Sequence, residues 1–290
     1  MKYYYALLIL LLPAALTAAP VKLHPDTIKA DADTATERKR SVSVGINYGS
    51  DVQFFGRTGP ITYPFISADA IYNTKQGFFI YTSGLKVLGY EPFFDEIDLG
   101  AGYLYKLSKK FSGTASYTRF FFNKDAAQII KSASSNDVNW KNIYDWKIAQ
   151  SSVTMDYLFG KESDFFVTLN TSKYYESKFS IFDDKDYLSI NPSVSLILGT
   201  QNFIQKYSVD HQFIEQINNI AAAGGDPHPL THNNGRFNML NYNFKIPVAY
   251  NRPHYTLEFA YKYSIPVNVE GILLNRRESF YNLTFYYVFY

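Results

Sequence analysis

The chain has 290 residues, no cysteine and a formal net charge of +2 from 28 basic and 26 acidic residues. The absence of cysteine excludes disulfides, thiolate metal sites and a lipid-modified N-terminal cysteine. The near balance of charge gives no reason to expect nucleic acid or an acidic macromolecule as a partner, whereas the aromatic share of 18%, with 26 Tyr and 24 Phe, is a marked feature.

The first residues predict a secretory signal peptide over 1–19. Lys2 precedes an apolar run that ends at Leu16, and the small residues 17–19 follow it. The run is shorter than a spanning helix needs, and no charged flank follows that would stop its transfer. Residues 20–40, which end in a basic cluster at 38–40, show no sustained periodicity and are interpreted as an N-terminal tail.

From residue 41 onward, apolar and polar side chains alternate with a period of two. Val42, Val44 and Ile46 alternate with Ser43 and Gly45, for example, which places one set on each face of a strand. The same test along the chain predicts strands near 41–50, 62–73, 77–88, 95–107, 110–122, 147–159, 163–175, 187–199, 202–213, 237–249, 254–267 and 278–290.

The connections between these segments alternate in length. Brief ones fall at 74–76, 108–109, 160–162, 200–201 and 251–253, with longer ones between them. Short turns on one side and long loops on the other are typical of membrane-spanning barrels, in which the sheet must close because lipid offers no hydrogen bonds. The sequence therefore predicts an all-β fold over 41–290: a transmembrane antiparallel β-barrel of about 12 strands, with short periplasmic turns, longer extracellular loops and a periplasmic tail at 20–40.

A soluble β-sandwich is the alternative, because its strands also alternate. Large aromatic residues at one strand end after another, and a chain that finishes in Tyr286-Tyr287-Val288-Phe289-Tyr290, favour the barrel instead.

The predicted signal peptide, the turn and loop pattern and the aromatic last strand resemble bacterial outer-membrane β-barrel proteins in general, over nearly the whole mature chain. The resemblance implies location in the outer membrane and contact with its lipid and lipopolysaccharide. It also implies recognition by the barrel assembly machinery through Phe285, Tyr287, Phe289 and Tyr290. The apolar alternation in this strand runs one residue out of phase with Tyr290, and no motif indicates a narrower family.

In a barrel the polar face of each strand lines the lumen. Strand parity and polarity predict charged lumen residues at Asp69, Lys86, Glu96, Asp98, Asp156, Lys206, Asp210, Lys245, Glu258 and Lys262. Twelve strands lie between the packed interior of eight and the wide channel of sixteen to eighteen, so the count allows a narrow pore or a plugged one.

Two charged positions admit more than one interpretation. A two-residue turn at Asn251-Arg252 places Lys245 opposite Glu258, and a slip of two places it opposite Ala260; the pair is either a constriction that screens solutes or an ion pair that only closes the lumen, and we favour the second. Arg119 falls on the lipid side near the long-loop end, where it either reaches lipopolysaccharide phosphates or marks a bulge.

Three segments carry residue types that could support chemistry, and none of them is predicted to be a site. Asp226, His228 and His232 share a proline-containing loop, and 183–186 is acidic but lacks the glycine and glutamate of a calcium loop. Asp210 and His211 face opposite sides of a strand, and no serine motif accompanies them. We expect no catalytic residue, cofactor or metal. The loop 123–145 either folds into the lumen or returns along the surface on Trp140, Tyr144 and Trp146.

The leading functional hypothesis is a narrow channel or passive transporter for small polar solutes. The second is a plugged structural or surface-binding barrel whose loops contact partners. A lipid or peptide hydrolase is less well supported, because the chain shows no recognisable nucleophile and base.

Overall fold

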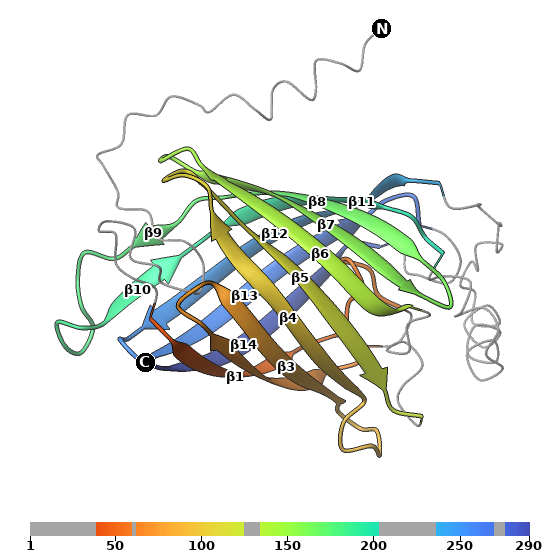
Figure 1. Ribbon diagram of the computed structural model, residues 1–290, viewed down its shortest axis with the longest axis horizontal. Coiled ribbons are helices and arrows are strands. Elements are labelled where there is room, and N and C mark those ends of the chain that lie inside the picture. The colour runs from red at the N-terminus through yellow and green to blue at the C-terminus, as the bar shows by residue number, and fades with distance from the viewer. Residues whose placement is uncertain (1–38, 60–61, 125–133, 203–235, 270–275) are drawn as a thin grey trace, which may run out of the picture.

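The computed structural model describes residues 39–59, 62–124, 134–202, 236–269 and 276–290. Within them the chain forms one antiparallel sheet (Figure 1), with strands β1 (Ser41–Gly49), β2 (Phe65–Asn73), β3 (Phe78–Val87), β4 (Glu96–Lys106), β5 (Phe111–Phe122), β6 (Ser134–Asp145), β7 (Gln150–Gly160), β8 (Asp164–Ser172), β9 (Tyr175–Glu176), β10 (Tyr187–Ile190), β11 (Ser193–Gly199), β12 (Asn238–Asn251), β13 (Tyr255–Pro266) and β14 (Glu278–Phe289). Within the described ranges, no helix is long and apolar enough to cross a membrane.

The sheet closes on itself. Hydrogen-bonded neighbours run from β1 through β8 to β11, then through β12 and β13 to β14, which pairs with β1 again, so twelve strands form a barrel. The two remaining strands, β9 and β10, extend the wall beyond β8 and β11 at the end that carries the C-terminus (Figure 1). A single closed layer excludes the two-layer sandwich.

The outer face of this ring is apolar on every side. Alternate residues such as Ile46, Phe78 and Phe259 are 58%, 60% and 48% exposed, and they belong to strands spread around the barrel. These apolar side chains form rows that continue from one strand to the next; Ile46 of β1, for example, pairs with Phe285 of β14. Water would make so continuous an apolar surface costly, at about 25 cal/mol per Å², whereas lipid does not. The fold is therefore that of a membrane-spanning barrel, the class of the bacterial outer-membrane barrels.

The predicted strands match the described ones with two exceptions. Residues 134–145, for which the sequence pattern predicts a loop, form β6, paired with β5 on one side and β7 on the other. The predicted strand at 202–213 lies outside the described residues beyond Asn202, and the ring closes without it because β11 pairs directly with β12. The predicted strand number was right because these two differences offset each other.

The extra strand at β6 reverses the direction of β7, β8 and β11. We call the end of the barrel at which β1 begins and β14 ends the turn side, and the opposite end the loop side. The connections at 161–163 and after Gly199 therefore lie on the loop side, so their prediction as periplasmic turns was wrong, and the segment between β9 and β10 lies on the turn side. The turns at 74–77, 107–110 and 252–254 lie on that side as predicted, and the turn at 146–149, which follows the additional strand β6, joins them there.

The partner of β12 changes from β11 to β10 at a point where each side carries a proline. Pro192 separates β10 from β11, and Pro247 lies on β12 between the stretch paired with β11 and the stretch paired with β10. Proline has no amide hydrogen to donate, so neither Pro192 nor Pro247 can donate to the ladder there, and the Pro247 carbonyl accepts from the Asn191 amide at 3.4 Å.

The Arg119 side chain and one row of β14 side chains lie on the outer face. The Arg119 guanidinium donates to Ser135 Oγ at 3.1 Å and Asn136 Oδ1 at 2.8 Å, and β5 pairs with both neighbours without a register shift, so the bulge interpretation is wrong. In β14 the exposed row includes Phe285 and Phe289, out of phase with Tyr290 as the sequence pattern indicated.

Candidate functional site: the lumen and its inserted hairpin

Seven of the predicted lumen residues project from the inner face. They lie in the rows that alternate with the exposed apolar ones and come from β2, β4, β7, β12 and β13: Asp69, Glu96, Asp98, Asp156, Lys245, Glu258 and Lys262. The acids of β4 and β7 form one wall and the lysines of β12 and β13 another, so the lumen is lined by charge of both signs.

The prediction for Lys86 was wrong. β3 keeps an unbroken register, so Lys86 shares the outer face with Phe78 and Ile80, and it pairs with Ile66. It lies at the loop end of the strand, where its amine donates to the carbonyl of Tyr90. Lys206 and Asp210 fall outside the described residues.

β6 contributes two charged lumen residues that the sequence analysis missed. Asp137 pairs with Thr118 and Lys141 with Thr114, both on inward rows of β5. One carboxylate oxygen of Asp137, like one of Asp98, is buried without a hydrogen-bond partner in the described chain. The signal that could have found them is the alternation of Val138, Trp140 and Tyr144.

The Lys245 contact was predicted correctly, but its register was wrong. Lys245 lies opposite Lys262, and Pro247 lies opposite Ala260, yet the Lys245 Nζ reaches Glu258 Oε1 at 3.6 Å. The longer turn between β12 and β13 shifts the pairing, and the long side chains cross the inner surface to meet. The Lys245 side chain is 46% exposed, which indicates a solvent-accessible lumen at this level.

Two inward aromatic rings of β3 lie against glycines of the neighbouring strand. Tyr81 of β3 covers Gly100, and Phe79 covers Gly102, because a Cβ at either glycine would overlap the ring. The Tyr81 hydroxyl is also hydrogen-bonded to Thr118. Glycine therefore gives these two rings room at the wall.

The loop-side mouth is crossed by the connection between β1 and β2. We call residues 50–59 and 62–64 the mouth hairpin. Phe54 and Arg57 exchange backbone hydrogen bonds of 2.9 and 3.0 Å, and the two residues between them, Phe55 and Gly56, have φ of 47° and 79°. Positive φ at both positions defines a type I′ turn, which suits glycine and strains phenylalanine.

The tip of the mouth hairpin packs against the wall across the mouth from its origin. The Phe55 ring stacks on Phe166 of β8 at 3.6 Å between centroids and 8° between planes. The Gly56 carbonyl accepts hydrogen bonds from Asn241 of β12 at 3.1 Å and from Ser264 of β13 at 2.8 Å. These contacts offset the backbone strain at Phe55.

Arg57 anchors the tip. Its guanidinium donates to the carbonyls of Leu240 and Val267 at 3.2 and 2.6 Å and to the side chain of Gln201, and the residue is only 2% exposed. An arginine held by several acceptors in a dry site is costly to release, because each acceptor then loses its partner.

The stem of the mouth hairpin packs against the wall beside β1 and β2, where it begins and ends. Tyr63 packs with Val87, and its amide donates to Asp51 Oδ1 at 2.7 Å. Burial raises the pKa of the Asp51 carboxyl to about 6, and the neighbouring Glu278 adds to the rise while the Tyr63 hydrogen bond opposes it. Glu278 in turn accepts a hydrogen bond from the Thr58 hydroxyl.

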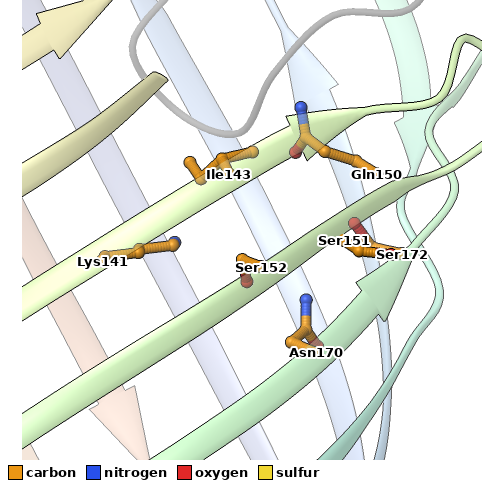
Figure 2. Close-up of a pocket in the computed structure, with 7 residues that line it drawn as sticks. All are labelled: Lys141, Ile143, Gln150, Ser151, Ser152, Asn170 and Ser172. Carbon is orange, nitrogen blue, oxygen red and sulfur yellow. The ribbon is translucent and has the colours of Figure 1, made fainter. Parts of the chain in front are cut away.

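The turn-side half of the lumen contains a polar pocket on β6, β7 and β8 (Figure 2). Strand parity places all but one of its lining residues on the inner face, the exception being Ser151: Lys141, Ile143, Gln150, Ser151, Ser152, Asn170 and Ser172. The structure therefore combines a mouth occupied by the hairpin with a wet, polar interior.

The acidic stretch 183–186 has a structural use. Asp186 accepts hydrogen bonds from the amides of Ile181, Phe182 and Asp183, and Asp183 forms an ion pair with Arg252. In the described part of the chain, no group of three or more His, Asp or Glu is placed to hold a metal. The candidates Asp226, His228 and His232, like His211, lie outside that part.

Comparison with known proteins gives structural similarity only. No family model and no curated protein matches the sequence. The barrel is similar to the KdgM porin, with 9% identity, a TM-score of 0.47 and coverage of 86% of this chain and 99% of that one. It is similar to the NanC porin, with 10% identity, a TM-score of 0.47 and coverage of 84% and 98%. An outer membrane channel from Pseudomonas putida F1 gives 11% identity, a TM-score of 0.42 and coverage of 89% and 99%. The barrel architecture stands on the strand pairing and the apolar exterior, independently of these values.

Proposed function

We propose that the protein is a bacterial outer-membrane channel through which small polar solutes diffuse passively. The observation that carries the proposal is the solvent-accessible inner surface, where Lys245 is 46% exposed inside a closed ring of strands. Charged and polar side chains line that surface, and the inward rings of Phe79 and Tyr81 lie against the wall. A lumen of this kind offers a path for water and hydrophilic solutes, with selection by width and charge.

The mouth hairpin sets the width of the path at the loop side. It crosses from β3, where Tyr63 packs, to β8, where Phe55 stacks on Phe166. The passage then runs beside the hairpin, and we infer that it follows the acidic wall of Glu96, Asp98 and Asp137. A solute must therefore be small.

Liposome swelling tests this function. Proteoliposomes that hold the purified full chain should swell in isotonic solutions of small sugars and amino acids and should swell progressively more slowly as solute size increases. Vesicles that swell no faster than protein-free controls for every solute, down to the smallest, would refute the proposal.

A plugged barrel is the second candidate, and the Arg57 anchor favours it. A guanidinium that is 2% exposed and bound to three separate segments would suit a permanent closure as well as a constriction. Release of the hairpin distinguishes the two: an Arg57→Ala barrel that conducts while the wild type does not would support the plug.

Location and partners are part of the same proposal. We infer export through the predicted signal peptide 1–19, insertion by the assembly machinery through the last strand, and contact of the exterior with outer-membrane lipid. On the outer face, Arg119 lies toward the loop side beside Ser135 and Asn136, which suits an exchange of these partners for lipopolysaccharide phosphate.

A further inference from the structure

The pocket on β6, β7 and β8 has the chemistry of a binding site. Its lining supplies one cationic group and several neutral hydrogen-bonding groups from three adjacent strands, and no carboxylate is among the lining residues (Figure 2). Lys141 lies at one edge of the pocket, and the hydrogen-bonding side chains of Gln150, Ser152, Asn170 and Ser172 line the rest of it, with Ile143 as one apolar side (Figure 2).

Lys141 is available to a ligand. Among the described residues no carboxylate lies within ion-pair distance of its amine, in contrast to Lys245, which reaches Glu258. The carboxylates that flank this stretch of wall are engaged elsewhere: Asp156 accepts a hydrogen bond from Asn139 at 2.6 Å, and Asp145 accepts one from the Lys147 amide at 2.6 Å.

Asn170 is oriented so that it donates into the pocket. Its Oδ1 accepts a hydrogen bond from the Ser195 hydroxyl at 2.7 Å, which fixes the amide group. The Nδ2 is then directed to the other side, and Figure 2 shows this nitrogen and the Lys141 amine on either side of Ser152. An ammonium, an amide N–H and hydroxyls around one small space form a donor set that matches the two oxygens of a carboxylate.

We propose that this pocket binds the carboxylate group of small organic acids during their passage, with Lys141 as the charge partner and Asn170 and Ser152 as further donors. The inference rests on the proposed channel only in that the solute reaches the pocket through the lumen. It adds a preference: a carboxylated solute is retained at the wall, and a neutral solute of the same size is not.

Isothermal titration calorimetry of the full barrel in nonionic detergent tests the proposal without requiring conduction. The probes are gluconate and sorbitol, which are open-chain and similar in size, and only gluconate carries a carboxylate. We expect gluconate to bind at least tenfold more tightly than sorbitol. Lys141→Gln should weaken gluconate binding by about tenfold, since a charge-assisted hydrogen bond is worth about 1.5–3 kcal/mol and 1.4 kcal/mol is tenfold.

Two further variants keep the result decisive. Lys245→Gln removes a lumen lysine that lies outside the pocket and should leave gluconate binding within about twofold of wild type. Asn170→Asp keeps the shape of the pocket but places a negative charge in it, so it should weaken gluconate and leave sorbitol unchanged even where Lys141→Gln folds poorly. Equal binding of the two probes, or an equal loss in the Lys245→Gln variant, would overturn the proposal. A barrel that binds gluconate yet fails to swell liposomes would instead refute the channel.

Discussion

The two ends of the lumen are built differently although the same strands form both. At the loop side, Arg57 and Phe166 are 2% and 0% exposed, and the hairpin tip is hydrogen-bonded to β12 and β13. Toward the turn side the wall is polar, with open space beside Lys141. The closed ring of strands therefore encloses the lumen, and the mouth hairpin between β1 and β2 occupies part of its cross-section. The proposed function therefore depends on a loop that the barrel wall positions.

The largest effect should follow from Arg57→Ala. The substitution removes the hydrogen bonds to Leu240, Val267 and Gln201, and each bond to a charged group contributes about 1.5–3 kcal/mol. Loss of about 3 kcal/mol raises the undocked population by about 100-fold. Single-channel recording should show a larger and longer-lived open state.

Arg252→Ala is the matched control, since this partly buried arginine pairs with Asp183 and lies over the Tyr255 ring at the turn side, and its conductance should equal wild type. An unchanged conductance in Arg57→Ala would mean that the mouth hairpin does not limit the path.

Alanine substitutions at two glycines separate the effect of the docking contact on conductance from the effect of backbone strain. Gly56 and Gly89 both have positive φ, of 79° and 89°, but a Cβ at Gly56 would overlap the Asn241 side chain and a Cβ at Gly89 would meet nothing within 4 Å. Both alanine substitutions cost about 1 kcal/mol of strain. Only Gly56→Ala should raise the conductance, by an amount below that of Arg57→Ala. Equal effects of the two substitutions on conductance would show that docking of the hairpin tip does not limit the path.

The mouth hairpin should dock more tightly at low pH. The pKa of Asp51 is about 6 when the hairpin is docked, against an ordinary value of 3.8, because burial disfavours its charged form. A raised pKa means that the docked state binds the proton more tightly, so docking is strongest below about pH 4 and weakens as the pH rises through 6.

Conductance measured between pH 4 and pH 7 should therefore rise with pH in the wild type. Asp51→Asn can still accept the Tyr63 hydrogen bond and cannot titrate, so its profile should be flatter. A wild-type profile that falls across this interval would contradict the assignment.

The smallest effect is expected inside the lumen. The Lys245 and Glu258 side chains are 46% and 19% exposed, and an exposed pair contributes about 0–1 kcal/mol. Lys245→Ala should leave the thermal unfolding temperature and the conductance nearly unchanged and should shift the reversal potential modestly toward cations. A clear rise in conductance would show instead that the pair closes the lumen, as the ion-pair interpretation of the sequence requires.

Local patterning predicted most of the barrel wall. Strands such as β1 and β13 alternate cleanly because lipid contacts one face and the lumen the other, so their period of two is strong. β6 was missed because Asn136, Asp137 and Asn139 have low strand propensity, and neighbours on both sides stabilise it regardless. That omission also reversed the predicted direction of β7 and β8.

Contacts between distant segments limited the prediction of the site. The sequence around Phe55 and Gly56 indicates a turn, but nothing in it specifies that the tip reaches Phe166 or that Arg57 binds the carbonyls of Leu240 and Val267. These contacts depend on barrel closure. Lys86 was assigned by its polarity, whereas its strand parity with Phe78 and Ile80 indicated the outer face.

Planar-bilayer recording of the wild-type protein beside Arg57→Ala tests the central claim most directly. We predict that the wild type opens a small channel with a stable conductance and that the variant opens a larger one in the same membrane. Bilayers that stay silent with both proteins, although both insert fully folded, would contradict the claim that this barrel encloses a water-filled path narrowed by the mouth hairpin.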